Sequence, residues 1–400
     1  MCEIVGQAVL LPVPTMAKRI QSIDILRGAV MIVMALDHTR DFIHIGAQSF
    51  SPEDLTRTTP AIFFTRWITH FCAPAFMLTA GLSAYLWAQR RATLGQLSKF
   101  LVTRGLWLII LELTVVRLGM YFNFDYSLIM LLVFWGWGCC MIALAALIWL
   151  PFRVLAGLSA GLILLHNLLD GIQAKQFGSA GWVWIVLHQI GTFRIDGHVI
   201  LVAYSLIPWV AVMAGGYCLG RVFLLEPPRR QKILIRLGLG LTLAFLLIRA
   251  LNVYGDPRPW SPRTLISFLN CTKYPPSLDF LLMTLGPALT VMGLIENVRL
   301  NSRNPLLVFG RVPLFYFVLH LPLIHLIALV MAWVRYGRVA FFLNGTPAMG
   351  GPRKLFPLDF GWDLWVVYAV WIVTLALMYP LCRWYAALKE RRQDWWLTYL

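Results

Sequence analysis

The chain has 400 residues, of which 59% are hydrophobic and only 13% are charged. Soluble domains carry roughly 25% charged residues, so this composition excludes an ordinary soluble enzyme and indicates a polytopic membrane protein. The net charge of +16 fits the positive-inside bias of membrane proteins and contact with anionic lipid headgroups or an anionic cofactor. A nucleic-acid groove would require a basic run interleaved with aromatic residues, and the sequence has none.

The first residues are weakly apolar and lack the early Lys or Arg of a signal peptide. We expect residues 1–18 to be a disordered extension and residues 19–400 to form a single transmembrane domain, because no soluble domain and no internal repeat is evident. None of the seven cysteines falls in a CxxC pair, so we predict no metal site.

Apolar segments of about the length that a bilayer requires recur along the chain. They predict an all-α polytopic membrane protein with about ten transmembrane helices in the cell inner membrane or plasma membrane. The face richer in Lys and Arg is predicted to be cytoplasmic, which places both termini inside. The spans are expected near 23–45, 69–88, 104–122, 127–150, 154–170, 199–219, 233–251, 278–299, 305–333 and 363–383.

The first span carries an unusual group of ionisable residues at its outer end. Such groups are costly at membrane depth and usually functional. Asp37, Asp41 and His44 follow helical spacing and share one face. His38 is a candidate general base, since a neighbouring carboxylate orients an imidazole and stabilises its charged form. The alternative is a helix end hydrogen-bonded to headgroups, with Arg40 and Asp41 as a structural pair.

Two further positions carry polar groups at the ends of spans. His70 enters the second span at the level of His38, so it is a candidate catalytic residue or a buried structural histidine that needs a partner. Asp24 and Arg27 lie at the inner end of the first span, either as an interfacial ion pair or facing a cavity that admits an anionic ligand from the cytoplasm.

Later segments add candidates for binding a second substrate. Lys273 and Tyr274 precede two prolines in an outer loop, where Lys273 is suited to an anionic or sugar-like acceptor, unless the segment is only a stiff surface turn. Tyr316 and His320 are four residues apart in a span containing prolines. This pattern fits either a cavity or a helix–helix hydrogen bond.

The opening motif, Ser22-Ile-Asp24-Ile-Leu-Arg27-Gly28 followed by Asp37-His38, resembles the catalytic domain of heparan-alpha-glucosaminide N-acetyltransferase, in its bacterial branch. The spacing is also similar to the opening motif of acyltransferase family 3, a group of transmembrane acyltransferases. Later stretches that resemble the same branch are Lys273-Tyr-Pro-Pro-Ser277, Phe315-Tyr316-Phe-Val-Leu-His320 and Trp395-Trp396-Leu-Thr-Tyr399-Leu400.

The resemblance implies a membrane acyltransferase that moves an acetyl group from cytoplasmic acetyl-CoA to a hydroxyl or amine of an extracytoplasmic sugar or glycan. It is compatible with a homodimer. By position, His38 matches the family-3 histidine, whereas the active histidine of the eukaryotic enzyme lies further on, nearest to His44. The choice between them, and between direct transfer and an acyl-histidine, stays open. Candidate donor-binding residues at the inner face are the arginines Arg27, Arg311, Arg90 and Arg91, whose guanidinium groups suit the donor's phosphates, together with Asp24.

Two other functions fit parts of the pattern. A proton-coupled transporter would use Asp37, His38 and Asp41 as a proton relay, although the missing inverted repeats argue against it. A non-catalytic scaffold of the cell envelope would leave the intramembrane histidine and aspartates unexplained.

Overall fold

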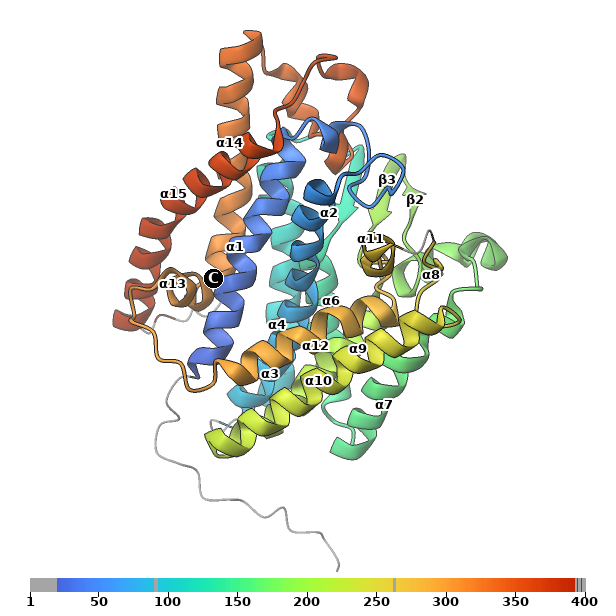
Figure 1. The fold of residues 1–400 in the computed structure, drawn as a ribbon, viewed down its shortest axis with the longest axis vertical. Helices are drawn as coiled ribbons and strands as arrows, with labels where there is room; N and C mark the ends of the chain where they lie inside the picture. The colour runs from blue at the N-terminus through green and yellow to red at the C-terminus, as the bar shows by residue number, and fades with distance from the viewer. Residues whose placement is uncertain (1–19, 90–92, 262–263, 393, 395–396, 398–400) are drawn as a thin grey trace, which may run out of the picture.

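The structure, a computed structural model, describes residues 20–89, 93–261, 264–392, 394 and 397, and most of these lie in helices (Figure 1). The predicted extension 1–18 lies outside the described residues. Within these residues, six helical segments are long and apolar enough to cross a membrane, and two shorter helices are also apolar. The helical, multi-pass character agrees with the prediction, whereas the number of spans and the side of the termini remain predictions.

Each of the ten predicted spans overlaps at least one helix. In chain order the helices are α1 (Gln21–Ile43), α2 (Pro60–Trp67), α3 (Cys72–Ala88), α4 (Leu94–Leu111), α5 (Arg117–Tyr121), α6 (Val133–Leu147), α7 (Phe152–Leu165), α8 (Gly181–Leu187), α9 (Leu206–Leu219), α10 (Pro227–Leu251), α11 (Leu265–Leu269), α12 (Leu278–Leu294), α13 (Pro305–Arg311), α14 (Pro313–Tyr336) and α15 (Leu364–Arg391).

The all-α prediction is wrong at one end of the molecule, where the described residues contain a small sheet. Its strands are β1 (Leu128–Leu131), β2 (Gly191–Ile195) and β3 (His198–Val202), in the order β1-β3-β2. β3 pairs with β1 in parallel and with β2 antiparallel. The predicted spans 127–150 and 199–219 therefore begin in strands, because a short apolar run does not distinguish a strand from a buried helix.

α1 lies in the middle of the molecule and contacts α3, α12, α13, α14 and α15 (Figure 1). The single span predicted at 305–333 forms two helices, because the chain turns at Val312 and α14 begins with Pro313 at its first position. α13 packs closely on α1 through two glycines: Gly28 faces the backbone of Leu306, and Gly310 faces the backbone of Asp24.

Replacing Gly28 with alanine should destabilise the protein by about 3 kcal/mol, at the upper end of the cost of overpacking. The added methyl would collide with the carbonyl oxygen of Leu306, and backbone cannot move aside as a flexible side chain can. Thermal unfolding in detergent would measure the loss. Gly157→Ala on α7 is the matched control, because nothing lies within 4 Å of its added methyl; equal melting temperatures for the two variants would contradict the close packing.

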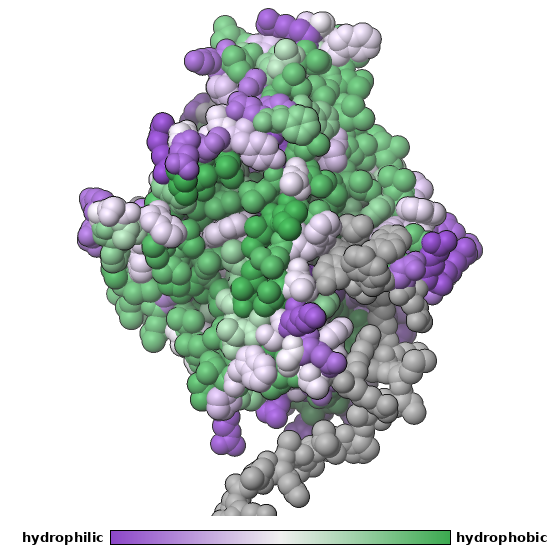
Figure 2. All heavy atoms as spheres, turned by 180° about the vertical axis from the view of Figure 1, so that it is seen from behind, coloured by the Kyte–Doolittle hydropathy of each residue, from purple (hydrophilic) through white to green (hydrophobic). Residues whose placement is uncertain are grey.

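We call the end of the molecule that carries Ile43 and the sheet the outer end, following the predicted orientation. There the segment after α14 covers the end of α1: Trp362 exchanges backbone hydrogen bonds with Ile43 and Ile45, and the Thr346 hydroxyl donates to the carbonyl of Asp41. Apolar side chains cover much of the middle of the face drawn in Figure 2, as expected of a surface in contact with lipid.

Candidate functional site

Ionised side chains gather where the outer end of α1 meets α2. Asp37 forms ion pairs with two guanidinium groups: Arg40 on the same helix, at 3.0 Å, and Arg66 on α2, which also donates a hydrogen bond to it. Arg40 also contacts Asp41. Asp37 and Arg40 are almost fully buried. Burying unpaired charges costs several kcal/mol per ion, and the Asp37–Arg66 pair joins α1 to α2.

Glu53 joins this cluster from the loop between α1 and α2. Its Oε1 lies 3.3 Å from Arg66 Nε and 3.1 Å from Nε2 of the buried His70. Burial by itself would raise the pKa of Glu53, but the hydrogen bond from His70 and the charge of Arg66 outweigh it and hold that pKa well below its ordinary value of 4.5. Glu53 is therefore ionised at neutral pH. We call Asp37, Arg40, Asp41, Glu53, Arg66 and His70 the charge network.

His38 lies beside this network and faces a second histidine. The rings of His38 on α1 and His320 on α14 have centroids 5.1 Å apart. His320 Nδ1 lies 2.7 Å from the carbonyl of Phe317 and must donate to it, so Nε2 is left as the acceptor in the neutral ring. Among the described residues, neither His320 Nε2 nor His38 Nδ1 has a hydrogen-bond partner.

Tyr316 extends this group along α14. Its ring stacks on His320 with a centroid distance of 5.3 Å, and both side chains are fully buried. The Tyr316 hydroxyl also lacks a partner within the described part of the chain. Buried polar groups are nearly always hydrogen-bonded, so three unpaired groups in one place indicate a position for a polar ligand or water.

His44 lies elsewhere. It follows the last residue of α1, and its Nδ1 accepts a hydrogen bond of 3.1 Å from the backbone N–H of Gly46. Its backbone pairs with Trp362. These contacts fix the ring and the backbone of His44 at the end of α1.

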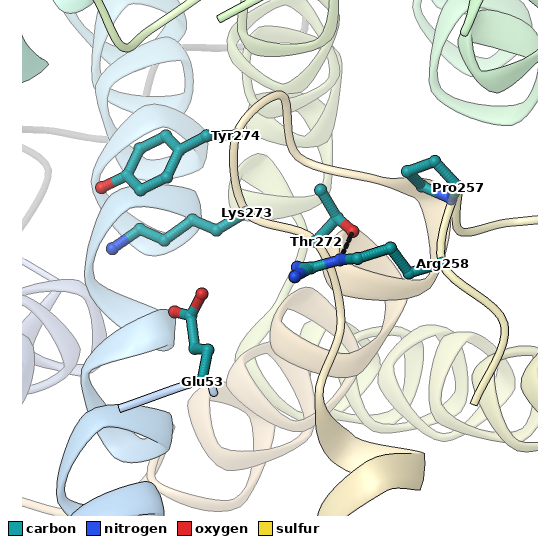
Figure 3. A pocket seen from close by; sticks show the side chains of 6 residues that line it. All are labelled: Glu53, Pro257, Arg258, Thr272, Lys273 and Tyr274. Carbon is teal, nitrogen blue, oxygen red and sulfur yellow. Dashed lines mark hydrogen bonds between the residues drawn. The ribbon is translucent and has the colours of Figure 1, made fainter. Parts of the chain in front are cut away.

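A pocket of about 350 Å³ opens beside the charge network (Figure 3). Lys273, Tyr274 and Glu53 extend into the same space, and Arg258 approaches it from the opposite side, with its Nε donating to the Thr272 hydroxyl at 3.0 Å. The predicted substrate-binding pair Lys273 and Tyr274 thus lies in one pocket with Glu53.

The predicted donor contacts at the inner end are spread over several helices. Asp24 is buried on α1, and Arg27 donates to the Thr79 carbonyl at 2.7 Å and to the Ser83 hydroxyl at 2.8 Å, both on α3. Arg311 on α13 forms an ion pair with Glu390 at 2.9 Å. Arg90 and Arg91 lie outside the described residues.

Sequence reasoning missed Arg66, Glu53 and Arg258. Arg66 and Glu53 lie in or next to a long outer loop, and a long loop that is not a linker is usually functional. Charged residues in such a loop were therefore the sequence feature that could have identified them as site residues. Their partners lie on other elements, however, and no spacing along the chain reports such contacts.

A bundle of apolar helices that buries histidines beside a charge network belongs to the class of membrane proteins with an internal polar site. Comparison with families defines it further. The sequence profile described as heparan-alpha-glucosaminide N-acetyltransferase, catalytic, matches residues 19–254. The chain therefore belongs to this family, and it is a membrane acetyltransferase of a family that uses acetyl-CoA as donor. A search of proteins with curated functions found no match.

Proposed function

We propose that the chain transfers an acetyl group from cytoplasmic acetyl-CoA to a hydroxyl or amine of a sugar or glycan on the outer side, with His38 as the general base or the acyl carrier. The observation that carries this proposal is the position of His38. Its half-buried ring follows Asp37 of the charge network on α1 and lies 5.1 Å from the ring of His320 on α14, and its Nδ1 has no hydrogen-bond partner among the described residues.

The three unpaired polar groups fit an acyl donor. A thioester carbonyl and the amides of pantetheine need hydrogen-bond partners inside an apolar bundle. Tyr316 would donate its hydroxyl proton and His320 Nε2 would accept an amide N–H; both groups are buried and without partners among the described residues. Arg27 and Arg311 lie toward the inner end and are the candidates for meeting the phosphates.

His38 would take the proton of the acceptor. An imidazole titrates near neutral pH, and the adjacent Asp37 is fixed by two guanidinium groups, so its charge stays in one place beside the ring. Asp41 adds a second carboxylate one turn further along the helix. The acceptor would enter through the pocket lined by Lys273 and Tyr274, which opens beside Glu53.

Purified protein in liposomes tests this function. Labelled acetyl-CoA is added outside the liposomes, and a panel of amino sugars and neutral sugars is trapped inside. Protein molecules inserted with their cytoplasmic face outward should then acetylate a trapped sugar and release CoA to the outside. Mass spectrometry identifies the acetylated product. Protein-free liposomes are the control. Proton-coupled uptake of a sugar without CoA release would instead support the transporter and contradict the proposal.

A further inference from the structure

Lys273 is buried, and among the described residues its ammonium has no carboxylate partner. Only 6% of its surface is exposed, yet it forms no ion pair within 4 Å to any residue that the structure describes. Its ammonium lies 5.2 Å from the centre of the Tyr274 ring and borders the outer pocket (Figure 3). The charge of Lys273 also acts on Glu53, Asp37 and His38.

The backbone on both sides of Lys273 is held firmly. Asp256 accepts hydrogen bonds of 2.7 Å from the Thr272 N–H and of 2.7 Å from the Ser277 hydroxyl. The buried guanidinium of Arg249 donates to the carbonyls of Ser267 and Asn270 in the preceding segment. The loop therefore holds the lysine in a fixed position. A fixed position is needed by a group that stabilises a charge present only in the transition state.

The carboxylates around Lys273 already have other cations as partners. Asp37 is paired with Arg40 and Arg66, Asp41 with Arg40, and Glu53 with Arg66. An ammonium taken out of water without an anion is costly. The arrangement is explained if the negative charge that Lys273 stabilises appears only during the reaction.

We propose that Lys273 is a catalytic residue that stabilises the oxyanion formed at the thioester carbonyl; this inference rests on the proposed function. The attacking nitrogen or oxygen forms a bond to the carbonyl carbon, the carbonyl electron pair moves to oxygen, and the nucleophile's proton passes to His38. The oxyanion then collapses, the C–S bond breaks, and the CoA thiolate takes the proton. If His38 attacks first, the same oxyanion forms and Lys273 acts in the same way.

A competing role for Lys273 is to bind an acidic substituent of the acceptor. The exposed Arg258 at the opposite wall of the pocket is better placed for that role, whereas the buried Lys273 exerts its charge on His38. The two roles differ in one measurable way: an oxyanion forms even when water replaces the acceptor.

The test is the hydrolysis of acetyl-CoA without any acceptor, followed by thiol release, alongside transfer to the acceptor found in liposomes. In Lys273→Met, kcat for both reactions should fall by about 10²–10³-fold, with the KM for acetyl-CoA almost unchanged. Lys273→Arg should retain part of both rates. Lys175→Met, which removes an exposed outer lysine, is the matched control and should behave as wild type.

Each outcome decides a different question. If Lys273→Met hydrolyses acetyl-CoA at the wild-type rate and only its KM for acceptor rises, the oxyanion role is wrong and acceptor binding is correct. If Lys273→Met unfolds, Lys273→Gln and Lys273→Arg carry the test, and wild-type hydrolysis by folded Lys273→Gln overturns the proposal. A wild-type protein that neither hydrolyses nor transfers refutes the proposed function itself.

Discussion

His38→Gln should lower acetyl transfer by about 10²–10⁴-fold, the usual contribution of a positioned general base. Glutamine is close in size to histidine but does not take up a proton near neutral pH. The fold should be unaffected, because His38 Nδ1 makes no hydrogen bond to the described residues. The measurements are the rate of CoA thiol release and the melting temperature of the purified variant.

His44→Gln separates the two candidate histidines. The substitution disturbs the hydrogen bond from the Gly46 N–H, so it should cost about 1 kcal/mol of stability and change the transfer rate by less than about threefold, a small effect beside that of losing a general base. A variant pair with the opposite pattern, active with His38 replaced and inactive with His44 replaced, would assign the reaction to His44.

Arg66→Met should have the largest effect on stability within the charge network, about 3–5 kcal/mol. Arg66 is the only described arginine that joins Asp37 to Glu53, and its removal leaves two ionised carboxylates short of a cation. Arg66→Lys should recover only part of the lost stability, because an ammonium restores the charge but cannot contact both carboxylates as a planar guanidinium does. Thermal unfolding in detergent gives the difference from wild type.

Arg57→Met is the control for Arg66. Arg57 belongs to the same outer segment but is exposed, and its guanidinium donates to the carbonyl of Ser49. Its replacement should change stability by less than about 1 kcal/mol. If Arg66→Met unfolds at the same temperature as Arg57→Met, the buried ion pairs do not determine the position of α2 against α1.

The sequence predicted the helices well because long apolar segments report burial in a membrane directly. The prediction was wrong at 128–131 and 198–202, because a short run such as His198-Val-Ile-Leu-Val202 suits a strand as well as a helix. A strand forms there because the segment pairs with Gly191–Ile195, and the sequence does not reveal that pairing.

For the candidate site, spacing along α1 was sufficient to single out Asp37, His38 and Asp41, because neighbours on one helix follow a fixed period. Contacts between elements were not predictable in this way. Arg66 reaches Asp37 across 29 positions of the chain, and the approach of His38 to His320 depends on how α14 packs against α1. The predicted roles of all these residues remain proposals.

The family match ends at residue 254, before the loop that holds Lys273 and before the helix that presents His320. A gene product truncated there would retain the matched residues and His38, but would lose His320 and the loop that carries Lys273. Such a remnant would still match the family, although under the proposed roles of Lys273 and His320 it would lack two groups that act on the thioester.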